Sequence, residues 1–198
     1  MNRHRLFSYV VEHDTGEAPN PYFGCCTLCL CKFREEPTKP RNIVELANEG
    51  DWIIGTGGAN SKKSAGNGKL VYAMRVDRKV TLAEYYADPA YACKKPSQNS
   101  RFARQRGDNK RPKNSFERKK RFVLISKHFY YFGDKAKAIP SSKRRQFEKK
   151  GVGFRYLNEK CAGWFENWIK RFKRGRHGEP WMKASLERKA AQACKSSC

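Results

Sequence analysis

The polar residues with the greatest chemical potential lie near the start of the chain. Asp14, Asn20, Thr27 and Lys32 offer a carboxylate, an amide, a hydroxyl and an ammonium group within a short stretch. Such groups can hydrogen-bond to the edge of a base and meet a phosphate. Two prolines restrict the backbone between them. We therefore expect these four side chains to converge on one nucleotide pocket.

A nucleotide site also needs flat surfaces for the base and a close backbone approach to the phosphates. Phe23 and Trp52 are candidate stacking faces, although a tryptophan in the apolar run Trp-Ile-Ile is more typical of a protein core. Gly55, Thr56 and Gly57 form a segment whose backbone N–H groups can approach a phosphate. The alternative for this segment is a plain turn at the end of a strand.

Four cysteines crowd positions 25–31, and Cys26-x-x-Cys29 has the spacing of half a zinc site. A structural zinc needs four ligands, and the chain has no second C-x-x-C. We therefore expect neither a metal nor another cofactor, and small buried apolar side chains are the favoured interpretation. If the protein is an enzyme, Asp14 and Cys26 are the candidate catalytic residues, and a cysteine nucleophile would need a neighbouring base.

The charge of the chain predicts a polyanionic partner. Lys and Arg number 43 against 19 Asp and Glu, which gives a net charge of +24, and the second half of the chain carries almost all of it. This asymmetry favours DNA or RNA as the partner. The residues that we expect to contact a nucleic-acid backbone are Lys110, Arg111, Lys113, Arg118, Lys119, Lys120, Arg144, Arg145, Lys170, Arg171, Lys173 and Arg174.

Composition excludes several classes of protein. No apolar run approaches the roughly 20 residues of a membrane span, so we expect no membrane partner. Aromatic residues make up 13% of the chain, which is too many for full disorder. The charged N-terminus lacks a signal-peptide cleavage site, and the eight cysteines are interpreted as reduced thiols. These features predict a cytoplasmic protein, in the host cytoplasm if it is viral.

Strands dominate the first two-thirds of the chain and helices the remainder. Apolar and β-branched runs predict strands at 5–11, 51–55, 69–76, 121–125 and 128–132. Helices are expected at 42–47, from a capping box at Thr81 through Tyr86, at 142–150, from Asn158 through Arg171, and from about Pro180. The fold class is α+β, with a small bent or barrel-like mixed sheet, flanking helices and a basic helical C-terminus.

The composition also divides the chain into two parts. Residues 1–142 are the expected core domain, with a basic mobile insertion at about 94–119 that is rich in Lys, Arg, Asn, Gln and Ser. Residues 143–198 are the expected basic helical extension, packed on that core.

Several phrases together resemble a known family. They are Leu6-Phe-Ser-Tyr-Val-Val11, Asp14-x-Gly-x-Ala-Pro-Asn-Pro21, Gly24-x-Cys-Thr-Leu-x-x-Cys-Lys32, Gly50-Asp-Trp-Ile-Ile-Gly-Thr-Gly57, Leu70-Val-Tyr-Ala-Met-Arg-Val76 and Tyr130-Tyr-Phe-Gly133. They are similar to the nucleotide modification associated domain 2 family of bacteria and bacteriophages. The sequence departs from the family pattern at Cys29, where a small residue is expected, and at Phe33, where proline is expected. The resemblance implies a setting in DNA-base hypermodification.

A weaker similarity points to PUA, EVE and ASCH domains, which are small barrels that hold modified bases or nucleic acid. It rests on the order of a helix, a Gly-Asp pair, a strand, a polar loop and a second strand. The expected function is recognition of a base or nucleotide in a polar and aromatic pocket. One open alternative is an enzyme of base or nucleotide modification that uses Asp14 or Cys26, and another is a coating, inhibitor or DNA-mimic-binding protein that acts through charge alone. The expected partners are DNA, RNA or a free nucleotide, together with a protein of a base-modification or defence system.

Overall fold

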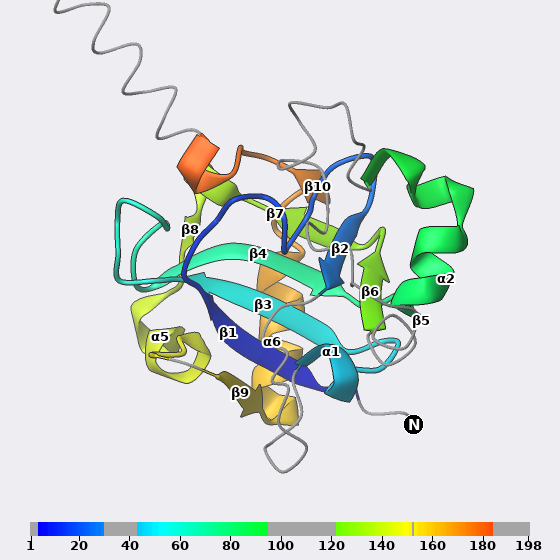
Figure 1. The fold of residues 1–198 in the computed structure, drawn as a ribbon. Helices are drawn as coiled ribbons and strands as arrows, with labels where there is room; N and C mark the ends of the chain where they lie inside the picture. The colour runs from blue at the N-terminus through cyan, green and yellow to red at the C-terminus, as the bar shows by residue number, and fades with distance from the viewer. Residues whose placement is uncertain (1–3, 30–42, 95–121, 152, 184–198) are drawn as a thin grey trace, which may run out of the picture.

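The computed structural model describes residues 4–29, 43–94, 122–151 and 153–183. A larger sheet forms the centre of the molecule, with the order β10-β7-β4-β3-β1-β9 and β8 paired to β4 (Figure 1). Its strands are β1 (Leu6–Val11), β3 (Trp52–Gly57), β4 (Lys69–Arg75), β7 (Phe129–Tyr131), β8 (Lys137–Ala138), β9 (Phe154–Leu157) and β10 (Gly175–Arg176).

The larger sheet is mixed and open. β1 pairs with β3 in parallel, as β10 does with β7, whereas the other pairings are antiparallel. Within the described ranges the end strands β10 and β9 do not pair with each other, so this sheet is not closed into a barrel. The predicted α+β class with a mixed sheet is confirmed.

A smaller antiparallel sheet packs against one face of the larger one. It has the order β2-β6-β5 and consists of β2 (Cys26–Cys29), β5 (Arg78–Thr81) and β6 (Phe122–Ser126). The short helices around it are α1 (Ile43–Leu46), α2 (Leu82–Ala87) and the 3-10 helix η1 (Pro89–Lys94). The capping box predicted at Thr81 is present, since Thr81 and Glu84 bond reciprocally at the start of α2.

Two apolar cores lie on the two faces of the larger sheet, and a third packs α2 against the smaller sheet. The first lies between the sheets and includes Phe7 and Tyr131, and the second lies behind the larger sheet, under α5 (Ser141–Phe147) and α6 (Glu159–Ile169). Figure 1 shows α6 behind β1, β3 and β4, with β2 and β6 in front. As predicted, Asn158 caps α6. Since β9 pairs with β1, residues beyond 142 share this core, and the domain boundary at 142 stays a prediction.

The predicted strands at 121–125 and 128–132 correspond to β6 and β7, but they belong to different sheets. The Ser126 hydroxyl donates to the Arg75 and His128 carbonyls where the chain crosses between the sheets. Of the predicted insertion at 94–119, only Lys94 is among the described residues. The last predicted helix is described only through Lys183. A 3-10 helix, η2 (Gly133–Lys135), follows β7. None of the helices in the described ranges has the length and apolar character required to cross a membrane.

Candidate nucleotide site and basic surface

A row of buried residues crosses the larger sheet on the face that meets the smaller sheet. Tyr9, Gly55, Tyr72 and Tyr131 occupy matching register positions on β1, β3, β4 and β7, and we call them the tyrosine row. The Tyr9 and Tyr72 hydroxyls are 2.8 Å apart and hydrogen-bonded. A Cβ on Gly55 would lie 2.4 Å from Cε1 of Tyr72. The glycine therefore leaves the space in which the Tyr72 ring crosses β3.

Asp14 lies at one end of this row and is only 1% exposed. Its Oδ1 accepts a hydrogen bond from the Tyr131 hydroxyl (2.5 Å) and its Oδ2 from the Trp181 amide (3.0 Å). Its backbone N–H donates to Lys63, and its carbonyl accepts from Met182. Burial raises the pKa of Asp14, and burial together with the Asp14 carboxylate raises the pKa of Tyr131. Asp14 thus ties the segment after β1 to β7 and to the C-terminal segment.

The second catalytic candidate, Cys26, lies in the same core as the tyrosine row and is close enough to Tyr131 to contribute to its raised pKa. Cys25 and Cys29 pack in a different core, against α2, because alternate residues of a strand face opposite sides. The C-x-x-C pair is therefore split between the two faces of β2. In the part of the chain that the structure describes, no group of three or more His, Cys, Asp or Glu residues could hold a metal ion, and the absence of zinc stays a prediction.

Asn20 and Thr27 lie opposite each other in an isolated β-bridge, and both are fully buried. Their convergence with Asp14 and Lys32 on one pocket stays a prediction. The Asn20 and Thr27 backbones exchange two hydrogen bonds, of 2.8 and 3.0 Å. The Asn20 Oδ1 accepts from the Tyr22 amide (3.2 Å). The Thr27 hydroxyl is buried and makes no hydrogen bond within the described residues. Because its side-chain Oδ1 accepts from Tyr22, Asn20 stabilises the loop that follows it.

Lys94 stabilises the same loop from the end of η1. Its side chain is buried, with 1% exposed, and its Nζ donates to the Asn20 carbonyl (3.1 Å), Asn20 Oδ1 (3.0 Å), the Tyr22 carbonyl (2.8 Å) and the Cys25 carbonyl (2.9 Å). A buried ammonium needs such partners to offset its desolvation. Sequence analysis missed Lys94, because nothing in Cys93-Lys94-Lys95 marks this lysine as a buried one.

The stabilised loop, residues 20–25, carries an exposed aromatic ring, and we call it the aromatic loop. Phe23 is 52% exposed and has a φ of +58°, which is uncommon for a bulky residue. The Tyr22 ring lies beside it (centroids 6.4 Å apart), with the Arg176 guanidinium 5.0 Å from the Tyr22 centroid. Glu179 accepts from the Tyr22 hydroxyl and pairs with Arg176. Burial, and then the Glu179 charge, raises the pKa of Tyr22.

The other predicted nucleotide-binding residues belong to packed parts of the larger sheet. Trp52 is buried in the core on the opposite face, where its Nε1 donates to Glu166 Oε1 (2.7 Å). The Thr56 hydroxyl donates to the Tyr9 carbonyl, and a Cβ on Gly57 would meet the Gly66 carbonyl. These positions have clear packing roles, and a nucleotide contact there stays a prediction. Lys32 lies outside the described residues.

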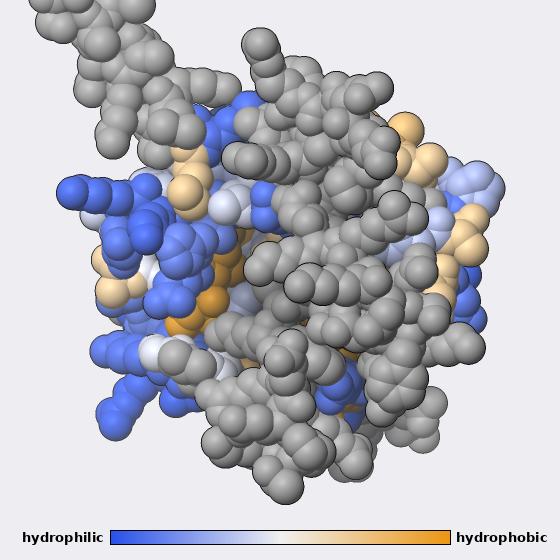
Figure 2. Space-filling model, viewed as in Figure 1, coloured by the Kyte–Doolittle hydropathy of each residue, from blue (hydrophilic) through white to orange (hydrophobic). Residues whose placement is uncertain are grey.

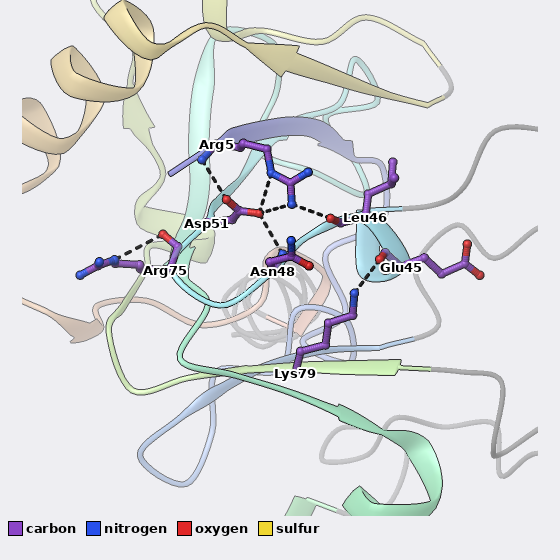
Figure 3. Close-up of polar contacts among 8 residues, drawn as sticks. Arg5, Glu45, Leu46, Asn48, Asp51, Arg75 and Lys79 are labelled. Atoms are coloured by element: carbon purple, nitrogen blue, oxygen red, sulfur yellow. Dashed lines mark hydrogen bonds and ion pairs between the residues drawn. The ribbon is translucent and has the colours of Figure 1, made fainter. Parts of the chain in front are cut away.

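Asp51, in the phrase Gly50-Asp51, has a structural role that Figure 3 shows. The Asp51 carboxylate accepts hydrogen bonds from the backbone N–H and the guanidinium of Arg5 and from the backbone N–H of Asn48. Nearby, the Lys79 Nζ donates to the Glu45 carbonyl (2.6 Å), and burial, followed by the Arg5 charge, lowers the pKa of Lys79. This network fixes the start of β1 against the turn before β3.

The structure describes half of the residues that were predicted to contact a nucleic-acid backbone, and the contact itself stays a prediction. These six residues are exposed, on α5 and after α6: Arg144, Arg145, Lys170, Arg171, Lys173 and Arg174. Figure 2 shows hydrophilic side chains gathered on the left of the molecule, where Figure 1 places α5 and the loop between β3 and β4. The other six predicted residues lie outside the described ranges: Lys110, Arg111, Lys113, Arg118, Lys119 and Lys120.

Fold and site together define an α+β protein with an open mixed sheet, an aromatic loop at one edge and a basic surface. The chain belongs to the nucleotide modification associated domain 2 family, whose model matches residues 3–122 and 110–188. This membership confirms the resemblance found in the sequence and associates the protein with nucleotide modification. Comparison with curated proteins and with solved structures found no match.

Proposed function

We propose that this protein binds nucleic acid or a nucleotide by stacking a base on Phe23. The observation that carries the proposal is the half-exposed Phe23 ring on a backbone that a phenylalanine rarely adopts. A left-handed conformation at such a residue costs about 1–3 kcal/mol and persists only where its surroundings impose it. Here Lys94 imposes it through the carbonyls on both sides of Phe23. An aromatic ring held in this way is preorganised for a planar ligand.

Cations lie beside the aromatic loop and support a phosphate-bearing ligand. Arg176 packs on the Tyr22 ring. The exposed cations that precede it along the chain are Lys170, Arg171, Lys173 and Arg174. Base stacking with backbone electrostatics is the usual combination for single-stranded nucleic acid. Burial of both catalytic candidates, Asp14 and Cys26, supports placing binding ahead of catalysis. We propose that this binding serves DNA-base modification. The proposed location is the cytoplasm of a bacterium, whether the protein is bacterial or comes from a bacteriophage that infects the cell. The proposed protein partner belongs to a modification or defence system.

The proposal is tested by the substitution Phe23→Gly. Glycine adopts a positive φ without strain, so this variant loses the ring while its melting temperature stays equal to that of the wild type or rises. Fluorescence anisotropy with a labelled single-stranded oligonucleotide measures affinity. Loss of one stacked base costs about 1–3 kcal/mol, so the dissociation constant should rise about ten- to a hundredfold.

The matched control is Tyr156→Ala on β9, which removes the other large exposed aromatic ring of the described residues (58% exposed). This variant should bind the oligonucleotide as the wild type does. Equal affinities for wild type and Phe23→Gly, at unchanged melting temperature, would refute stacking on Phe23. An equal loss in both variants would assign binding to general surface character instead of the aromatic loop.

A further inference from the structure

A second group of cationic side chains lies on the other face of the larger sheet, away from the aromatic loop. It consists of His4, Arg75, His128 and Arg174, and we call it the cation cluster. The Arg75 guanidinium donates to Nε2 of His4 (3.1 Å), and the Arg75 backbone N–H donates to the His128 carbonyl (3.0 Å). The His128 ring packs against Trp52, with centroids 5.1 Å apart. Trp52 belongs to the core under α6, so the cluster lies at the rim of that core.

Strand pairing brings Arg174 into the cluster. β10 runs parallel to β7, with Gly175 opposite Tyr130 and Arg176 opposite Tyr131. Residue 174 therefore comes next to the start of β7, where His128 lies, and its charge acts on the His128 imidazole. Arg176, two residues further along the chain, is not part of the cluster, because its guanidinium packs on Tyr22 of the aromatic loop.

Neither guanidinium group of the cluster forms an ion pair with a carboxylate within the described residues. Besides His4, the Arg75 side chain contacts the Gly50 carbonyl (3.4 Å), as Figure 3 shows, and Arg174 makes neither a hydrogen bond nor an ion pair there. Two carboxylates act on His128 from nearby elements. Asp77 Oδ2 accepts from the backbone N–H groups of Lys127 (2.5 Å) and His128 (3.3 Å), and Glu166 accepts from Trp52 (2.7 Å).

The pKa of His128 reflects its burial and the charges around it. Burial lowers the pKa of His128, and the Arg174 and Arg75 charges lower it further, whereas Asp77 and Glu166 act in the opposite direction. The remaining polar neighbour is the Tyr130 hydroxyl, 3.5 Å from Nε2. An anion bound among these groups would offset the repulsion between like charges, and it would favour the protonated imidazole as an additional donor.

We propose that the cation cluster is a binding site for a phosphate group, held by Arg75, Arg174 and His128. Two guanidinium groups and an imidazole are donors of the kind that bind phosphate through charge-assisted hydrogen bonds. The ligand class is a phosphate ester, whether a nucleotide or the backbone of a nucleic acid. The proposal does not depend on stacking at Phe23, because the two sites lie on opposite faces of the sheet.

NMR of the histidine Cε1–H groups in the full chain tests the site. The chain has four histidines, so the His128 resonance is assigned by its loss in His128→Gln. Sulfate is the probe for the pH titration, because its own charge is constant near neutral pH. At constant ionic strength, sulfate should move the midpoint of the His128 titration upward by about one pH unit. An unchanged midpoint overturns the proposal.

Matched charge substitutions locate the anion. Arg174→Gln should weaken the binding of inorganic phosphate about tenfold, whereas Lys160→Gln, which removes one positive charge from an exposed position on α6, should leave it within twofold. Equal losses in the two variants overturn the proposal, because they indicate only a general response to net charge. Phe23→Gly should not alter phosphate binding, so failure of the stacking proposal and failure of this site are distinguishable.

Two competitors identify the source of the phosphate group. A nucleoside monophosphate presents a phosphate monoester, and a short abasic oligonucleotide presents phosphodiesters without bases. Displacement of inorganic phosphate by either competitor, followed at the His128 resonance, supports the proposal and assigns the ligand to a nucleotide or to a nucleic-acid backbone. Displacement by neither overturns it.

Discussion

Substitution of Lys94 by methionine tests how the aromatic loop is held. Methionine keeps an unbranched apolar side chain of similar length but removes the ammonium group and its four contacts. Two of the four oxygens keep another donor, since the Asn20 carbonyl also accepts from the Thr27 amide and Asn20 Oδ1 from the Tyr22 amide. In the described part of the chain, the Tyr22 and Cys25 carbonyls depend on Lys94.

The expected loss of stability follows from these two carbonyls. Each buried acceptor that loses its donor costs about 1–3 kcal/mol, while the ammonium no longer has to be desolvated. We therefore expect Lys94→Met to lower the free energy of unfolding by about 2–5 kcal/mol. For a domain of this size, that corresponds to a fall in melting temperature of about 5–15 °C.

Urea denaturation followed by circular dichroism measures this loss against Lys170→Met, in which the substituted lysine is exposed. The control should lie within about 0.5 kcal/mol of the wild type. If Lys94→Met matches the control, the carbonyl contacts contribute no net stability, and the argument that Lys94 imposes the backbone of Phe23 fails.

Two further substitutions test the tyrosine row. Gly55→Ala places a methyl group 2.4 Å from Tyr72 Cε1, so urea denaturation should show a loss of about 1–3 kcal/mol. Gly163→Ala, at an exposed position of α6 with open space around it, should be neutral or stabilising. Because the folded-state pKa of Asp14 lies above its ordinary value of 3.8, the stability that this carboxyl contributes is greatest below pH 3.8 and is lost as the pH rises through its folded-state pKa. Asp14→Asn should remove that part of the pH dependence in melts between pH 3 and pH 7, and an unchanged profile would assign the dependence to another group.

Local signals in the sequence predicted the secondary structure well. The Thr81-to-Glu84 capping box and the Asn158 cap are specific hydrogen-bond patterns that depend on a few adjacent residues, and both are present. The largely apolar segment at 69–76 forms β4 (Lys69–Arg75). Placing β6 and β7 in separate sheets was beyond such signals, because the partners of these strands are distant in the chain.

The candidate site was predicted less completely, for a physical reason. A polar side chain in a proline-rich loop can serve a ligand or the protein itself, and the sequence does not separate these roles. Asp14 and Asn20 are buried and hydrogen-bonded to other parts of the chain. Lys94 and Arg176, which hold and flank the aromatic loop, come from segments far along the chain. Only the three-dimensional structure shows that they meet residues 20–25.

The pairing of β1 has a consequence for how the protein is made. β1 precedes both of its neighbours in the chain: β3 lies on one side, and β9, more than a hundred residues later, lies on the other. Contacts of such high contact order form slowly. During synthesis the apolar strand Leu6–Val11 therefore keeps one edge open until Leu157 has left the ribosome, and open edges of this kind promote aggregation. The residues around β9 thus protect the nascent chain as well as completing the sheet.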